Sequence, residues 1–172
     1  MNLFKQDTLS VDPGWNTGWA DWKYSDKANP FPDVGIFKLP PKIEKTFEER
    51  LIYMLDRFHG LLKTKNPKLL IIEGTEVWNS ALGNAAATKK TKLGFSPVIQ
   101  LSVLVGGYCA IAIGEVINFK IVSPAGKDGW KGQMNDEVIA ARIKRINGQT
   151  YPEHIREAVG LGFAMSNIKG GL

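Results

Sequence analysis

Apolar and polar residues along the chain are grouped in short runs that predict strands and helices. The first third favours strands over 5–12, 16–23 and 33–38, where apolar runs are separated by turn residues. A buried strand is predicted over 68–73, an aliphatic run that ends in a carboxylate, and another over 118–123. The pattern therefore predicts a sheet whose strands are interrupted by helices.

Two helices are predicted in the middle of the chain. Thr46 and Glu49 have the spacing of a capping box. The helix that follows has one apolar stripe, made of Phe47, Leu51, Met54, Leu55, Phe58 and Leu62. Ser96 and Pro97 are expected to begin the second helix, as its N-cap and first helical residue. The connection from the strand 68–73 to this second helix, 74–95, is long enough to predict a functional or mobile loop.

Two further helices are predicted near the C-terminus. Asn135 is expected to cap the first, whose apolar side is made of Val138, Ile139, Ile143 and Ile146. Pro152 is expected to open the second, whose inward side is made of Ile155, Ala158, Val159 and Phe163. The resulting order, β-β-β-α-β-α-β-α-α, is typical of a mixed sheet flanked by helices. We therefore expect one α/β domain over 1–172.

Composition adds two points to this picture. The formal net charge of +5 favours a polyanionic partner, and nucleic acid is one candidate. Cys109 is the only cysteine, which excludes a disulfide framework and a cysteine zinc site, and we expect it to be a buried thiol. The first residues, MNLFKQDT, contain no apolar signal core, so the expected location is the cytoplasm.

The segment 98–117 is nearly long enough to span a bilayer. Gln100 and Glu115 interrupt it, and two glycines occupy its middle. Because the rest of the chain has the pattern of a soluble domain, we expect a buried or dimer-facing helix here and no membrane partner.

Four polar positions suggest a metal site. Asp12 ends the first strand, Glu73 ends the strand 68–73, and His154 and Glu157 are three residues apart on one helical face. If the two strands are parallel neighbours, both carboxylates lie at the carboxyl edge of the sheet. Gathered carboxylates repel each other unless a cation neutralises them, and Mg²⁺ prefers oxygen ligands. Imidazole suits softer cations and can carry protons.

Each position also has a plain structural interpretation. Asp12 fits a plain hairpin with a solvated carboxylate, whereas the functional interpretation is a turn in which Gly14 and Gly18 let the backbone approach a phosphate ligand. Glu73 fits a carboxylate at a sheet edge, and the helical pair fits a surface ion pair with Arg156. The order of all four positions along the chain is more specific than any one of them.

Two loops add basic and aromatic candidates. The glycine-rich loop before the third helix contains Lys127, Trp130, Lys131 and Gln133. The connection 74–95 contains the basic run Lys89, Lys90 and Lys92. Trp78 in the same connection can stack on a nucleobase or anchor the loop in the core, and the sequence leaves both open.

Taken together, the motifs resemble the RuvC-type Holliday junction resolvases of the ribonuclease H-like superfamily, closest in style to the phage-encoded branch. The match spans nearly the whole chain in the right order. The residues behind the resemblance are Asp12-Pro13-Gly14 with Thr17-Gly18, Ile71-Ile72-Glu73, His154-x-x-Glu157-Ala158-x-Gly160, and the segment from Ser123-Pro124 to Trp130-Lys131-Gly132-Gln133.

The resemblance implies a ribonuclease H-like mixed β-sheet flanked by α-helices, and a homodimer that nicks a four-way DNA junction symmetrically with Mg²⁺ or Mn²⁺. Asp12, Glu73, His154 and Glu157 would be metal ligands, Asp12 bridging two ions, and Lys131 would offset phosphate charge. The expected DNA contacts are Trp78, Lys89, Lys90, Lys92, Lys127 and Lys131. Glu157 departs from the family, where Asp is usual, whereas His154 has precedent there.

Other functions fit parts of the pattern. An actin-like ATPase or sugar kinase shares the first motif but needs two such domains, and the chain is too short for both. A non-catalytic DNA-binding module is disfavoured because all four polar positions hold residues able to bind metal. A nuclease of the same fold that acts on other phage DNA, such as flaps or packaging substrates, stays open.

Overall fold

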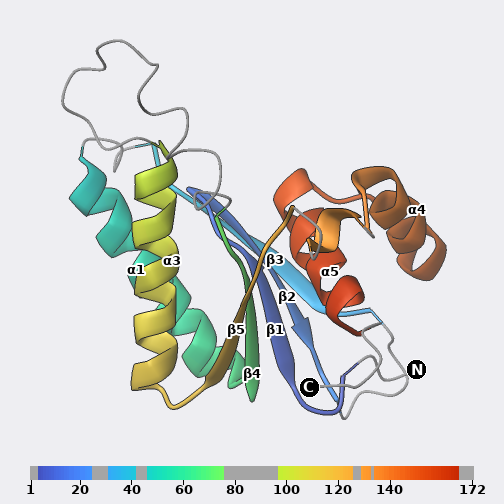
Figure 1. The fold of residues 1–172 in the computed structure, drawn as a ribbon, viewed down its shortest axis with the longest axis horizontal. Helices are drawn as coiled ribbons and strands as arrows, with labels where there is room; N and C mark the ends of the chain where they lie inside the picture. The colour runs from blue at the N-terminus through green and yellow to red at the C-terminus, as the bar shows by residue number, and fades with distance from the viewer. Residues whose placement is uncertain are drawn as a thin grey trace.

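A five-stranded mixed sheet forms the centre of the protein in the computed structural model (Figure 1). The structure describes residues 4–24, 31–41, 46–75, 97–125, 129–132 and 134–166. The strands are β1 (Thr8–Asp12), β2 (Asn16–Trp22), β3 (Asp33–Lys38), β4 (Leu69–Glu73) and β5 (Asn118–Val122). Their order is β3-β2-β1-β4-β5, with β1 antiparallel to β2 and parallel to β4. The carboxyl ends of β1 and β4 therefore meet at one edge.

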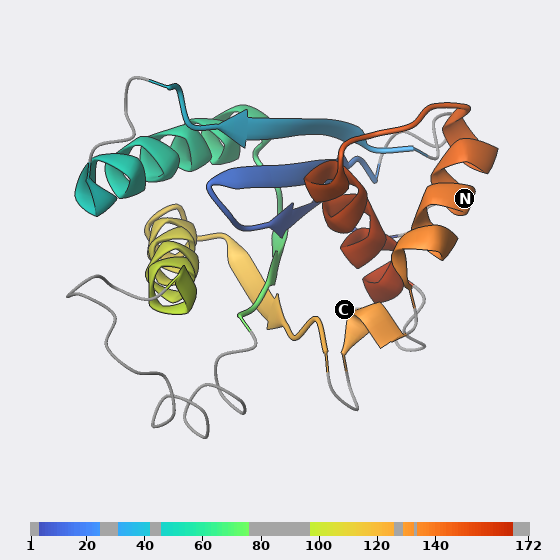
Figure 2. The ribbon, with the colours of Figure 1, turned by 90° about the horizontal axis from the view of Figure 1, so that it is seen from above.

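Helices cover both faces of this sheet (Figure 2). One face is covered by α1 (Phe47–Lys65) and α3 (Pro97–Gly114), and the other by α5 (Glu153–Ser166), against which α4 (Asp136–Asn147) packs. A short 3-10 helix, η1 (Trp130–Gly132), lies between β5 and α4 in the chain. This architecture confirms the α/β fold with a mixed sheet that the order of elements predicted.

The predicted helix caps at Thr46 and Asn135 are confirmed. The Thr46 hydroxyl accepts a hydrogen bond from the Glu49 N–H at 3.2 Å, and the Glu49 carboxylate accepts one from the Thr46 N–H, also at 3.2 Å. Asn135 Oδ1 accepts from the Val138 N–H at 3.0 Å. The cap predicted at Ser96 lies outside the described residues. Both caps satisfy N–H groups that have no partner within the helix.

One strand boundary and one helix side differ clearly from the sequence pattern. The first strand begins at Thr8, three residues later than predicted, because pairing with β2 and β4 begins only there. Val138 was predicted on the apolar side of its helix but is 46% exposed, while Ile139 and Ile143 are buried. The buried side of α4 is narrower because the helix packs mainly on α5.

The core on the α5 face contains one buried polar anchor. Ser10 of β1 donates a hydrogen bond to the backbone carbonyl of Ala158 at 2.7 Å and accepts one from Trp22 Nε1 at 2.8 Å. All three side chains are buried. Because a buried hydroxyl without a partner is costly, these bonds fix how α5 lies on β1 and β2.

The predicted apolar helix is α3. Among the described residues it is the one helix long and apolar enough to cross a membrane. Its inner side packs on the domain through Leu104, Val105, Tyr108, Cys109 and Ala112, which are buried. The expected burial of Cys109 is thus confirmed. The outer side, in contrast, exposes apolar and small residues, which are Val103, Gly106, Ala110 and Ile113.

Candidate metal centre

Asp12 and Glu73 leave the sheet from adjacent strand ends. Asp12 is the last residue of β1 and Glu73 the last of β4, and these strands pair in parallel with Val11 opposite Ile72. Asp12 is 6% exposed, and the Glu73 side chain is 11% exposed. The parallel pairing inferred from the sequence therefore brings two largely buried carboxylates to one edge.

The first two turns of α5 add the other two predicted residues. His154 Nδ1 lies 2.7 Å from Asp12 Oδ2 and 3.9 Å from Glu157 Oε2. Ligand atoms of Asp12, His154 and Glu157 all lie within 4.8 Å of one another. One imidazole and two carboxylates at this spacing could hold a single divalent cation.

Gly18 allows α5 to come this close. It lies opposite Asp12 in the β1–β2 ladder, and a Cβ built there would lie 2.0 Å from the backbone oxygen of His154. No real side chain tolerates that approach, so glycine is required where the helix meets the strand. We expected Gly18 to bring the backbone close to a ligand. In the structure its neighbour is instead the backbone of α5.

Lys131 lies between the carboxylates of Glu73 and Glu157. Its Nζ is 2.5 Å from Glu157 Oε1 and 3.3 Å from Glu73 Oε1. The backbone N–H of Lys131 donates to the carbonyl of Pro124 at 3.0 Å, and that of Trp130 to Ser123 at 3.1 Å. These bonds hold η1 close to the end of β5 and place Lys131 in the cluster.

Trp130 is a site residue that the sequence reasoning did not assign. Its side chain is buried, and its Nε1–H donates to Glu73 Oε2 at 3.1 Å. The sequence placed Trp130 in the same motif as Lys131 but gave it no role in the site. An indole nitrogen is a donor that must find a partner when buried, and this could have drawn attention to the strand-end carboxylate.

Burial and mutual repulsion disfavour the charged forms of the two strand-end carboxylates. Burial raises the pKa of Asp12 to about 6, against the opposing effect of its hydrogen bond with His154. Burial raises the pKa of Glu73 to about 7, and the negative charge of Asp12 adds to the shift. The hydrogen bond with Asp12 raises the pKa of His154. Burial lowers the pKa of Lys131, but its bond to Glu157 and the nearby Glu73 charge outweigh this and raise it.

These observations fit a divalent cation. The raised pKa values of Asp12 and Glu73 indicate that the present partners leave their negative charge incompletely neutralised. The donors are carboxylate oxygens and one imidazole nitrogen, a set that suits Mg²⁺ or Mn²⁺. The side chains of His154 and Lys131 are 36% and 37% exposed, so the cluster also opens to solvent.

The structure thus brings together the five predicted residues Asp12, Glu73, His154, Glu157 and Lys131. The other predicted DNA contacts lie outside the described residues and are Trp78, Lys89, Lys90, Lys92 and Lys127. Their roles therefore stay predictions.

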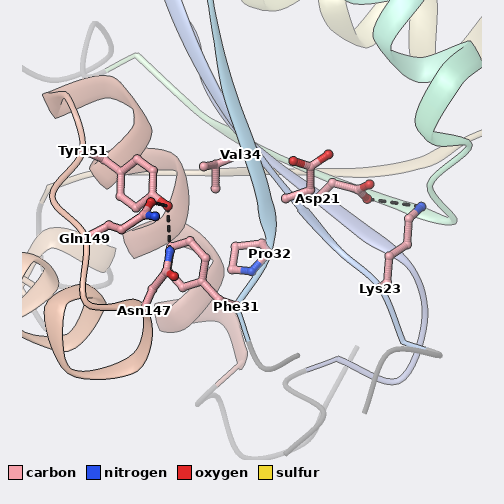
Figure 3. A pocket seen from close by; sticks show the side chains of 9 residues that line it. Asp21, Lys23, Phe31, Pro32, Val34, Asn147, Gln149 and Tyr151 are labelled. Atoms are coloured by element: carbon pink, nitrogen blue, oxygen red, sulfur yellow. Dashed lines mark hydrogen bonds and ion pairs between the residues drawn. The ribbon is translucent and has the colours of Figure 1, made fainter. Parts of the chain in front are cut away.

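A cavity of about 520 Å³ lies apart from this cluster (Figure 3). It lies at the other end of β2, where Asp21 is paired with Asp33 of β3. Asp21 is 1% exposed, and its carboxylate oxygens lie 3.4 Å from Lys23 Nζ and 3.7 Å from Lys65 Nζ. The two lysines offset part of the charge of this carboxylate, but neither of its oxygens accepts a hydrogen bond from a described residue, and burial raises its pKa.

No protein-family model matches the chain, and no curated protein matches it by sequence. Solved structures do match. Thermus thermophilus RuvC in complex with a Holliday junction substrate has a TM-score of 0.65 at 14% identity, over 93% of this chain and 92% of that one. Thermus thermophilus RuvC has a TM-score of 0.61 at 15% identity, over 93% of each chain.

A mitochondrial protein gives the same result. The yeast mitochondrial Holliday junction resolvase Ydc2 has a TM-score of 0.57 at 14% identity, over 94% of this chain and 78% of that one. At such identities the likeness is one of fold, and the phage-encoded branch stays a prediction. The chain therefore has the ribonuclease H-like fold of the RuvC-type Holliday junction resolvases, as its motifs predicted.

Proposed function

We propose that the protein is a metal-dependent endonuclease that resolves four-way DNA junctions by paired, symmetric nicks. The main support is the convergence of Asp12, Glu73, His154 and Glu157 at one sheet edge. The fold around this edge is that of RuvC, one of whose structures contains a Holliday junction substrate. The net charge of +5 is consistent with a DNA partner.

In this proposal Asp12, Glu73, His154 and Glu157 hold two Mg²⁺ ions, for which Mn²⁺ can substitute. The bound ions would activate the attacking water and stabilise the leaving oxygen of the phosphodiester. Without metal, the hydrogen bond between His154 Nδ1 and Asp12 Oδ2 keeps these two side chains together, and Trp130 Nε1–H holds Glu73 Oε2. The expected products have 5′-phosphate and 3′-hydroxyl ends.

Lys131 has a second task in the same proposal. Its side chain is more than one third exposed, and its ammonium group lies beside both Glu73 and Glu157. A phosphate that approaches these carboxylates meets this positive charge, which would offset the charge that develops during hydrolysis. The residues Trp78, Lys89, Lys90, Lys92 and Lys127 are proposed to contact the arms of the junction.

We propose that the protein acts as a homodimer joined through α3. Val103, Gly106, Ala110 and Ile113 recur every three or four residues on its exposed side. No atom lies within 4 Å of a Cβ built at Gly106, so a second helix has room to approach. Two coordinated nicks require two sites, which a symmetric dimer supplies. The proposed location is the cytoplasm of a bacterium or a phage-infected host.

A nicking assay tests this function directly. A labelled synthetic four-way junction is compared with linear duplex and with a flap of the same sequence, each with Mg²⁺ and with a chelator. We expect paired nicks on the junction only, and only with the metal. Cleavage of the flap in preference to the junction would favour the alternative nuclease, and junction binding without cleavage in any divalent metal would favour a non-catalytic module.

A further inference from the structure

The carboxylates of the metal centre form two groups that share Glu157. Its Oε2 lies on the side of Asp12 and His154, 3.9 Å from His154 Nδ1. Its Oε1 lies 2.5 Å from Lys131 Nζ, which is also 3.3 Å from Glu73 Oε1. The ammonium group of Lys131 therefore lies where a cation shared by Glu73 and Glu157 would lie.

We propose that the ammonium group of Lys131 occupies the position between Glu73 and Glu157 that a second metal ion would take. The protein without DNA therefore binds one divalent ion per chain. That ion is held by Asp12, His154 and Glu157, whose ligand atoms already lie within 4.8 Å of one another. A second ion enters only where the ammonium group has left. This inference rests on the proposed function in taking the cluster as a metal centre.

Charge and space both support this assignment. A divalent ion that joins Glu73 Oε1 to Glu157 Oε1 would have to take the place of the ammonium nitrogen, which contacts both oxygens. If the ammonium group and the divalent ion both stayed between Glu73 and Glu157, the two positive charges would repel each other strongly. Mg²⁺ and Mn²⁺ also lose bound water on coordination, and the lysine already offsets part of the negative charge of Glu73 and Glu157, so a second ion gains less there.

Two neighbouring contacts keep the lysine in this position. The Lys131 backbone N–H bonds the carbonyl of Pro124, which follows β5. Trp130 Nε1 holds Glu73 Oε2 at 3.1 Å, so Glu73 cannot turn from Lys131 without losing that bond. The lysine side chain is 37% exposed, which leaves it a path into solvent when a competing cation or anion is present.

Counting bound Mn²⁺ tests the proposal without any nuclease assay. The full-length protein is titrated with Mn²⁺ in the absence of DNA, and free Mn²⁺ is measured by its electron paramagnetic resonance signal. We expect one ion per wild-type chain and two per Lys131→Met chain, the second binding at least about tenfold more tightly than any second ion on the wild type. Lys131→Arg keeps the charge and should bind one ion.

Two comparisons locate the gained ion. Lys144→Met removes the same charge from an exposed lysine of α4 and should leave the count at one. Adding Glu73→Gln to Lys131→Met should also return the count to one, since the second ion needs that carboxylate. If Lys131→Met does not fold, Lys131→Gln takes its place in both comparisons.

Two results would overturn the inference. The first is a wild-type chain that binds two Mn²⁺ ions of similar affinity, and the second is a Lys131→Met chain that binds the same number with the same affinities as wild type. Because no DNA is present, the outcome is separate from the proposed function. A protein that gains the second ion but never nicks a junction would refute junction resolution and leave this inference standing.

Discussion

The helices α5 and α3 are both apolar and lie on opposite faces of one sheet, yet they differ in how they are held. α5 is fixed by polar contacts, through Ser10 on the Ala158 carbonyl and His154 on Asp12. α3 is held mainly by apolar packing on one side, while its other side exposes Val103 and Ile113. The difference shows that directional hydrogen bonds set the position of α5 against the sheet, whereas apolar packing on one side holds α3 and leaves its other side exposed.

A buried hydrogen bond connects α3 to the turn that follows Asp12. Tyr108 of α3 bonds the Thr17 hydroxyl at 2.9 Å, and that hydroxyl donates to the Gly14 carbonyl at 2.6 Å. Tyr108 is fully buried and stacks on Phe58 with ring centroids 3.9 Å apart. The turn that follows Asp12 is thereby tied to α3 as well as to the strand it leaves.

The largest effect on cleavage is expected at Asp12, the sheet-edge residue that His154 of α5 contacts. Asp12→Asn should lower junction cleavage by roughly 10³-fold or more, because the amide no longer provides a charged metal ligand. Junction affinity should change little, since it comes mainly from lysines and arginines on phosphates. Nicking rates and gel-shift affinities of the purified variant give both quantities, and wild-type nicking would remove Asp12 from the site.

The next effect is expected at Glu157, where the sequence departs from the family. Glu157→Gln should nearly abolish cleavage, whereas Glu157→Asp should retain measurable activity with an altered ratio of Mg²⁺ to Mn²⁺ rates. A helix-surface carboxylate would instead give full activity in Glu157→Gln, with a stability change below about 1 kcal/mol. Rates in each metal, together with thermal unfolding, separate these two outcomes.

Gly18→Ala tests the close approach of α5 to β2. The new methyl group would lie 2.0 Å from the His154 carbonyl oxygen, so the helix must move and the protein should lose about 3 kcal/mol of unfolding free energy. Cleavage should fall as well, because His154 and Glu157 move with the helix. Gly60→Ala in α1 is the matched control, as no atom lies within 4 Å of its Cβ position, and it should be neutral or stabilising. Urea unfolding of both variants measures the contrast.

A smaller effect is expected from pH on the metal-free protein. The folded-state pKa is raised from 3.8 to about 6 for Asp12 and from 4.5 to about 7 for Glu73. Between about pH 4 and about pH 7, the folded state therefore binds more protons than the unfolded state. The stabilisation that is present below about pH 4 is lost as the pH rises to about 7. We expect the unfolding free energy to fall by about 2 to 4 kcal/mol between pH 5 and pH 8. Mg²⁺ should restore it at pH 8, and Glu73→Gln should flatten the profile in chemical unfolding experiments.

The smallest effect on folding is expected at the outer side of α3. Val103→Arg should change the unfolding free energy of the single chain by no more than about 0.5 kcal/mol, because the side chain is already 40% exposed. If α3 joins two copies, the variant should become monomeric and make single nicks instead of paired ones. Sedimentation at micromolar concentration measures whether the variant is a monomer or a dimer. A Val103→Arg protein that remains dimeric would exclude this surface.

Much of the candidate site could be predicted from local patterns. Asp12 and Glu73 stand at the ends of apolar runs, and parallel neighbours bring such ends together. The spacing of His154 and Glu157 places both on one helical side. The order of these motifs along the chain then predicted the fold. The loop that contains Trp78 lies outside the described residues, so its predicted role stays a prediction.

The remaining contacts could not be predicted in this way. His154 and Asp12 are 142 residues apart in the chain, and Trp130 and Glu73 are 57 apart. No periodicity relates residues at such separations, so the hydrogen bond from Trp130 and the place of Lys131 had no local signal. Gly18 was expected to approach a ligand, but its neighbour is the backbone of α5. No local pattern relates the two, because α5 lies near the other end of the chain.

The sequence by itself therefore determined the elements, the caps at Thr46 and Asn135, and the acidic residues that end two strands. These features depend on bonds and periodicities that span a few residues. Only the tertiary structure decided that Gly18 admits α5, that Ser10 fixes it, and that Lys131 lies between Glu73 and Glu157. Those contacts form only when distant segments pack together, and their geometry depends on the path of the whole chain.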